Sequence, residues 1–189
     1  MLPLGMVLRT DFAGRCGAGT KPVKQSPRNG HASGLEAERE VGELLTQLLP
    51  DGCLVLNDIK FKYGNIDHIV IRLRPCPPHG YAGQVRPDKT VFLIETKSHR
   101  GKVTWNGKQL LINGRPFSRN PLCQVNRSIR WVRCMVKRLF GVNPWIVAVL
   151  VFPNADVLIR HSVKRVNVMG ADNLLEFIRS YPQKPIKKV

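Results

Sequence analysis

The 189-residue sequence has no long hydrophobic run and is poor in acidic residues. A helix that crosses a bilayer needs about 20 consecutive, mainly apolar residues, and no stretch approaches that length. Only 13 Asp and Glu oppose 30 Lys and Arg, which leaves a formal net charge of +17. An excess of this size favours a polyanionic partner, either nucleic acid or an anionic membrane surface. Of the two we predict nucleic acid, and no membrane.

The sequence also lacks the motifs of a zinc site, a disulfide framework or an ATP-driven motor. Its five cysteines are odd in number and form no C-x-x-C pair. This usage suits a reducing compartment, so we expect an intracellular, cytoplasmic protein. No G-x-x-x-x-G-K-S/T loop is present. A helicase partner, if there is one, would therefore be a separate chain.

Composition divides the chain into three expected segments. Residues 1–33 are rich in Gly, Pro and Ser and hold five basic residues against a single acid, which predicts a basic, disordered leader. Such a leader suits an organelle transit peptide, a nucleic-acid-binding arm or an over-extended gene start, and the sequence leaves these three open. We expect residues 34–180 to form one domain and residues 181–189 a basic tail.

Hydrophobic periodicity within this domain predicts alternating helices and strands. Helical spacing and capping residues predict helices at 35–49, 121–140 and 171–180. Short apolar runs predict strands at 53–59, 66–72, 90–97, 145–152 and near 164–168. Turn signals predict one or two hairpin turns at the Asn-Gly pairs 106–107 and 113–114 and a long loop at 74–89. The order predicts an α/β fold with a central mixed β-sheet flanked by helices.

Two charged residues close the strongest predicted strand. Glu95 and Lys97 are two positions apart, so both project from the same face, about 7 Å apart along the strand. A carboxylate there can hold a hard cation, while a lysine orients an attacking water or stabilises charge on a phosphate. The alternative is a salt bridge at an exposed edge. Asp67, which interrupts the preceding apolar strand, supports the first interpretation, although an acid at such a position is, taken alone, more often a strand-end cap.

Two further polar residues lie beside the apolar stripes of predicted helices. Glu38 precedes Val41 by three residues on the stripe that faces the core, and a buried carboxylate needs a cation, either a metal or a lysine. It could instead be a solvated carboxylate near the positive end of the helix. Gln124 lies one turn into the helix at 121–140, where its amide could bind a water or a phosphate or be incidental.

Basic residues without acidic counterparts indicate a candidate nucleic-acid surface. The helix at 121–140 carries Arg and Lys off its apolar stripe and no Asp or Glu, and further basic residues follow Lys97. Together they could follow a phosphate backbone, although a charged helix face is usually only solvated. The candidates for nucleic-acid contact are His99, Arg100, Lys102, Arg127, Arg130 and Lys137.

In combination these segments resemble the nuclease-related domain, NERD, a branch of the PD-(D/E)XK nuclease superfamily. The matching segments are GLEAE at 34–38, NIDHIV at 65–70, FLIETK at 92–97 and NPLCQ at 120–124. The resemblance covers residues 34–152, and its specificity lies in the combination and order of the segments. It implies a restriction-endonuclease-like core and a Mg²⁺ or Mn²⁺ ion held by Asp67, Glu95 and the backbone carbonyl of Thr96.

The resemblance also implies roles for three other side chains in phosphodiester hydrolysis. Lys97 would position the water nucleophile, Glu38 would reach the metal shell through water, and Gln124 would orient the site. The expected function is a divalent-metal-dependent nuclease that acts in DNA processing or repair, with DNA favoured over RNA. The alternative is a non-catalytic nucleic-acid-binding module with the same fold, accessory to a separate helicase or mobile-element protein. Carboxylates repel phosphate unless a cation lies between them, which favours the enzyme.

Overall fold

The computed structural model describes residues 29–61, 64–75, 85–141 and 143–182. Most of the expected leader, the centre of the expected loop at 74–89 and all but the first two residues of the expected tail lie outside these ranges. Among the described residues, no helix is long and apolar enough to cross a membrane.

A five-stranded mixed sheet forms the centre of the fold, in the order β1-β2-β3-β7-β9. Its strands are β1 (Cys53–Phe61), β2 (Gly64–Pro75), β3 (Val85–Thr96), β7 (Trp145–Val151) and β9 (Val166–Met169). β1, β2 and β3 are antiparallel neighbours, whereas β3, β7 and β9 run parallel. The predicted α/β fold with a central mixed sheet is therefore confirmed.

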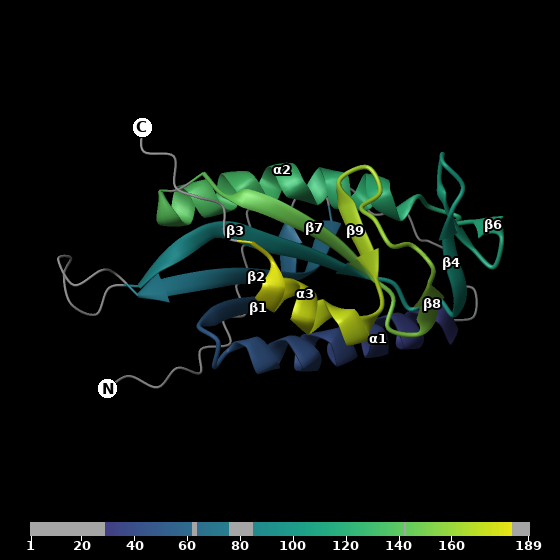
Figure 1. Cartoon of the computed structure of the whole chain (residues 1–189), viewed down its shortest axis with the longest axis horizontal. Helices are drawn as coiled ribbons and strands as arrows, with labels where there is room; N and C mark the ends of the chain where they lie inside the picture. The colour runs from purple at the N-terminus through teal and green to yellow at the C-terminus, as the bar shows by residue number, and fades with distance from the viewer. Residues whose placement is uncertain (1–28, 62–63, 76–84, 142, 183–189) are drawn as a thin grey trace, which may run out of the picture.

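Helices cover both faces of this sheet (Figure 1). They are α1 (Asn29–Leu45), α2 (Pro121–Phe140) and α3 (Leu174–Ser180), with short 3-10 segments η1 (Thr46–Leu48) and η2 (Ala171–Asn173). Side chains alternate along β3, so Leu93 joins Val125 of α2 in one buried cluster. Phe92 points to the other face and joins Leu45 of α1 and Ile178 of α3. The α2 face is the one that carries the candidate site.

A smaller four-stranded sheet, in the order β6-β5-β4-β8, lies at one end of the molecule (Figure 1). Its strands are β4 (Gly101–Trp105), β5 (Leu110–Ile112), β6 (Arg115–Pro116) and β8 (Ala155–Val157). Hairpin turns are present at both Asn-Gly pairs. Asn113 and Gly114 have φ of 49° and 76°, the positive pair of a type I′ turn, which explains why Asn-Gly is favoured there.

The helix α2 has the capping residues that its sequence predicts. The Asn120 side chain accepts a hydrogen bond from the Leu122 N–H at 3.0 Å, and Pro121 opens the first turn. Gly141 closes the helix with a φ of 66°, a left-handed conformation that glycine adopts at little cost. Leu139, in the last turn, is 64% exposed.

Several predicted boundaries were wrong. α1 begins at Asn29 rather than 35, although Gly30 and Gly34 are poor helix formers, and it ends at Leu45 before η1. The ends of the expected loop at 74–89 belong to strands, because β2 extends to Pro75 and β3 begins at Val85. The backbone of Pro87 pairs with β2, while β7 pairs β3 from Thr90 onward. Proline is tolerated there because it lies beyond the paired segment of β7.

Candidate active site

Asp67 and Glu95 lie at the same end of two neighbouring strands. His68 of β2 pairs with Ile94 of β3, so the residues just beyond this pair, Asp67 and Glu95, stand side by side on the α2 face. Asp67 is 6% and Glu95 2% exposed. The Asp67 Oδ2 accepts a hydrogen bond from the Thr96 N–H at 2.7 Å, which fixes one oxygen of this carboxylate. Two acidic side chains are thus buried next to each other.

Lys97 and Gln124 complete a hydrogen-bonded triad with Glu95. The Lys97 ammonium donates to Glu95 Oε1 at 2.7 Å and to Gln124 Oε1 at 3.2 Å. The Gln124 amide in turn donates to the same Glu95 oxygen. Gln124 reaches this point because it lies one turn into α2, beside the buried Val125. These hydrogen bonds hold the Lys97 ammonium beside the acidic residues and restrict the rotation of its side chain.

Glu38 approaches the same site from the opposite face of the sheet, on α1. It is half-buried, and its pKa is raised to about 6, first by burial and then by the negative charge of Asp67, against the attraction of Lys97. Burial also raises the pKa of Asp67 and of Glu95, and for Glu95 the Asp67 charge adds to the effect. For all three carboxylates, the combined effect of burial and like charge outweighs the nearby lysine.

Sequence reasoning missed a fourth acid, Asp58 of β1. Asn57 pairs with His68 and Ile59 with Ile66, so Asp58 stands opposite Asp67 across the strand pair. Its φ of 51° departs from strand geometry, and its charge contributes to the raised pKa of Asp67. The position depends on the register of two strands, which no local pattern in the sequence indicates.

His68 belongs to the other face of the sheet, where it is a packing residue. Its Nδ1 is 2.9 Å from Asn57 Oδ1, and its ring lies next to Gly42 of α1, where an added Cβ would meet it at 3.4 Å. Burial lowers the pKa of His68 to about 4, so the ring is neutral near pH 7. A neutral buried histidine supports the helix-on-sheet contact behind the site.

The donor set suits a hard divalent cation. Asp67 and Glu95 offer carboxylate oxygens, the ligand type that Mg²⁺ and Mn²⁺ prefer. Among the described residues, no three His, Cys, Asp or Glu side chains lie close enough together to hold a metal ion on their own. Mg²⁺ usually keeps several waters and takes only one or two carboxylates, so a pair of buried carboxylates suits this ion better than it suits an ion whose ligands all come from the protein. Glu38 would then act through water.

The expected nucleic-acid contacts fall into two groups. His99 and Arg100 directly precede β4, and Lys102 lies in it. The ring of His99 contacts that of Phe117 at 4.9 Å between centroids. The Asn113 side chain holds the backbone of this group, because it accepts from the Lys102 N–H at 2.8 Å and donates to the Arg100 carbonyl at 3.3 Å. The first group is therefore fixed at the end of the molecule where the small sheet lies.

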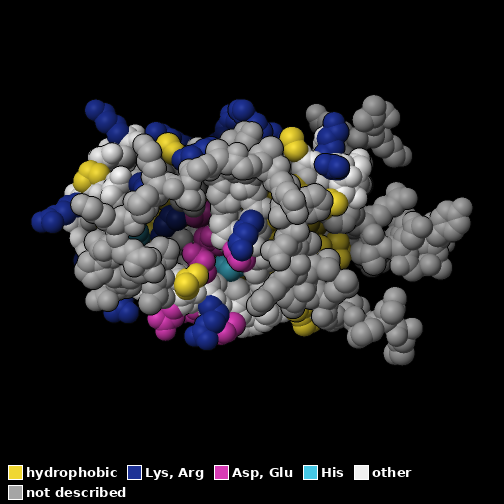
Figure 2. Space-filling model, turned by 180° about the vertical axis from the view of Figure 1, so that it is seen from behind, with side chains coloured by type: hydrophobic (Ala, Val, Ile, Leu, Met, Phe, Trp, Pro, Cys, Tyr) yellow, Lys and Arg dark blue, Asp and Glu magenta, His cyan; other side chains and the backbone are white. Residues whose placement is uncertain are grey.

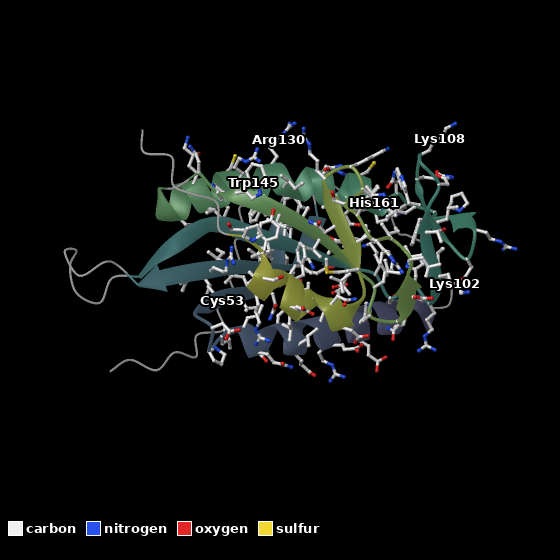
Figure 3. All side chains as sticks on the ribbon, in the orientation of Figure 1. Cys53, Lys102, Lys108, Arg130, Trp145 and His161 are labelled. Atoms are coloured by element: carbon white, nitrogen blue, oxygen red, sulfur yellow. The ribbon has the colours of Figure 1, made fainter. Side chains whose placement is uncertain are left out.

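The second group lies along the exposed side of α2. Arg127 is one turn from Gln124. Measured from Gln124 along the helix axis, Arg130 is about 9 Å and Lys137 about 20 Å away. All three are exposed, and Figure 3 shows Arg130 pointing away from the sheet. On the face drawn in Figure 2, acidic side chains gather near the middle with Lys and Arg beside them. Of the second group, only Arg127 is within a turn of the site.

The family comparison covers the segments that carry this geometry. The model of the nuclease-related domain matches residues 33–73 and 85–153. The chain belongs to the nuclease-related domain family. The matched ranges contain Glu38, Asp67, Glu95, Lys97 and Gln124, and the break between them falls in the expected loop. Comparisons with curated proteins and with solved structures gave no significant match. The nuclease-related domain therefore extends over α1 to β7, the part of the fold that positions the site.

Proposed function

We propose that this nuclease-related domain is a divalent-metal-dependent nuclease that hydrolyses phosphodiester bonds in nucleic acid, with DNA the favoured substrate. The observation that carries the proposal is the pair of adjacent buried carboxylates, Asp67 and Glu95, with the Lys97 ammonium 2.7 Å from Glu95. Buried like charges are costly unless a cation lies between them. A site for Mg²⁺ or Mn²⁺ at the end of a sheet, in a chain of net charge +17, suits catalysis on a polyanion.

Each side chain of the site has a role in the proposed reaction. Asp67, Glu95 and the backbone carbonyl of Thr96 would hold the ion. When bound, Mg²⁺ supplies stabilisation of the negative charge that develops on the phosphate. Lys97, held by Glu95 and Gln124, donates a hydrogen bond to the attacking water and aims it at the phosphorus.

Glu38 serves the same reaction from the opposite face of the sheet. Its pKa of about 6 lets its carboxylate accept a hydrogen bond or a proton from water near neutral pH. The half-buried position on α1 directs this acceptor toward Asp67 and Lys97 without placing it among the direct ligands.

The second candidate function is a non-catalytic nucleic-acid-binding module that acts with a separate helicase or mobile-element protein inside the cell. The exposed basic side of α2, with no acidic residue on the helix, favours binding of a phosphate backbone. A binding module would not need the buried carboxylates, because they weaken its attraction for phosphate. We therefore rank it below the enzyme.

Cleavage assays with single, matched lysine variants separate the two. Linear, supercoiled and single-stranded DNA, and RNA, are incubated with the wild type, Lys97→Ala and Lys108→Ala in Mg²⁺, Mn²⁺ or EDTA. Lys108 is an exposed residue of the β4–β5 turn and controls for loss of one positive charge. We expect metal-dependent cleavage that Lys97→Ala abolishes and Lys108→Ala retains. If the wild type binds DNA or RNA but cleaves neither in Mg²⁺ or Mn²⁺, the proposal of an enzyme is rejected in favour of the binding module.

A further inference from the structure

A polar pocket opens directly beside the candidate active site. It has a volume of about 230 Å³ and lies between the β1–β2 hairpin and the first turns of α2. Gln124, which holds Lys97 and Glu95 on one side, lines the pocket on the other. The volume is below the usual range for drug-sized ligands, about 300–1,000 Å³, so the pocket suits one small unit rather than an extended ligand. Whatever binds there touches the residue that orients the site.

The described rim of the pocket is positively charged. The charged residues that line it are Arg119, just before α2, and Arg127, one turn after Gln124; both are exposed at its rim. Arginine presents a planar fork of donors that matches phosphate oxygens. Two arginines next to the hydrogen-bonded triad suit the phosphate of a nucleotide that neighbours the bond to be cut.

The inner wall of the pocket carries a feature that phosphate alone does not satisfy. Asn65 lines the pocket, and its Oδ1 is buried and has no hydrogen-bond partner among the described residues. A buried carbonyl oxygen needs a donor, whereas a phosphodiester offers only acceptors. The ring N–H and amino groups of nucleobases are donors on the edge that pairs in a duplex.

An aromatic wall stands next to this acceptor. Phe61, at the end of β1, lines the pocket, and its ring is backed by Trp131 of α2 with the centroids 5.1 Å apart. A base can stack on such a surface whatever its identity, because every base has a π-face. The cationic rim suits the phosphate of a nucleotide, the aromatic wall suits the face of its base, and the buried acceptor suits a donor on the edge of the base.

We propose that this pocket takes one unpaired nucleotide next to the scissile bond, so that the enzyme acts on single-stranded, frayed or branched DNA in preference to intact duplex. The proposal rests on the nuclease function proposed above. In a duplex the pairing edge is occupied and the base is stacked on both faces, so a nucleotide reaches Phe61 and Asn65 only after it leaves the stack. Arg119 and Arg127 would bind its phosphate.

Binding measured without cleavage tests the pocket. Fluorescence anisotropy in EDTA compares a short oligothymidylate with a duplex of equal length, for the wild type, Phe61→Leu and Asn65→Ala. We expect Phe61→Leu to lower the single-strand affinity about tenfold and Asn65→Ala several-fold, with duplex affinity nearly unchanged. A fully abasic strand should bind the wild type and Phe61→Leu equally. If Phe61→Leu is poorly folded, the single-strand affinity of Asn65→Ala and the affinity of the wild type for the abasic strand test the proposal.

A double variant controls for charge. Arg119→Ala with Arg127→Ala should reduce single-strand affinity at least fivefold more than Arg130→Ala with Arg133→Ala, which removes the same charge from the exposed side of α2 outside the pocket. Equal losses in the two double variants would overturn the pocket and leave only a diffuse electrostatic surface. So would losses from Phe61→Leu and Asn65→Ala that are equal for single strand and duplex.

A small diester separates failure of the pocket from failure of the nuclease. Bis(p-nitrophenyl) phosphate has no nucleobase, so its cleavage by the wild type in Mn²⁺ reports the nuclease without the pocket, while the Asn65→Ala change should raise KM for single-stranded DNA. Selective single-strand binding without cleavage of either substrate would keep the pocket and reject the nuclease. Cleavage of both substrates with no single-strand preference would keep the nuclease and reject the pocket.

Discussion

Replacing Glu95 with Gln should stabilise the metal-free protein while it abolishes the proposed activity. Burial raises the pKa of Glu95 from 4.5 to about 7, and the attraction of Lys97 already opposes that shift. The charged carboxylate is therefore a net cost to the folded state above pH 7. Glutamine has nearly the same shape as the protonated acid, so it keeps the packing and removes the charge.

The magnitude follows from the linkage between pKa and stability. At a pH above both values, a shift of this size corresponds to an unfavourable contribution on the order of 3 kcal/mol to the free energy of unfolding, which Glu95→Gln would recover. For a domain of this length, that is a rise in melting temperature of roughly 6–12 °C. Below about pH 4.5 the carboxyl is protonated in both states, and the advantage of Glu95→Gln should vanish.

Denaturation in EDTA at high and low pH measures this effect. Glu40→Gln, at an exposed position of α1, is the matched control, and it should change stability by no more than about 0.5 kcal/mol. Added Mg²⁺ should raise the melting temperature of the wild type and not that of Glu95→Gln. A Glu95→Gln variant less stable than the wild type at high pH in EDTA would refute the reasoning, because it would mean that Lys97 and Gln124 overcompensate the burial of the charge.

Three further outcomes follow from buried or strained positions. Because burial lowers the pKa of His68 to about 4, the unfolded chain binds more protons than the folded chain below about pH 6.5. In urea titrations, the free energy of unfolding of the wild type should therefore fall by about 3 kcal/mol between pH 6.5 and pH 4, relative to that of His68→Gln. Gly101→Ala should cost about 3 kcal/mol, since φ is 109° and a Cβ would collide with Asn113, whereas Gly141→Ala, with open space and φ of 66°, should cost about 1 kcal/mol. Val125→Ala, which empties the core under α2, should cost roughly 2–3 kcal/mol by the same measurement.

Local patterns predicted the parts of the fold that depend on local chemistry. The Asn-Gly turns, the caps of α2 and the shared face of Glu95 and Lys97 follow from turn geometry, capping and strand alternation. Patterns were weaker where tertiary contacts override propensity. Strand β8, with three residues, was not predicted, and α1 begins at Asn29 despite its two glycines. The central mixed sheet followed from the order of elements.

Long-range register placed the remaining site residues. Alternation shows that Asp67 interrupts an apolar strand, but only the pairing of His68 with Ile94 places it beside Glu95. Sequence reasoning reached that neighbourhood through the family resemblance. Asp58 had no such support, because it belongs to the site only through the pairing of β1 with β2.

The balance of charge at the site favours a cation-dependent role over a structural one. A stabilising ion pair lowers the pKa of its carboxylate, whereas that of Glu95 is raised in spite of the lysine ammonium 2.7 Å away. The fold thus holds Asp67 and Glu95 in a place where their charge destabilises it. In a chain with an excess of 17 positive charges, neutral side chains there would favour both stability and phosphate binding. The acidic pair is explained if a divalent cation binds between it and the phosphate, and on that account removing the charge should increase stability and abolish cleavage together.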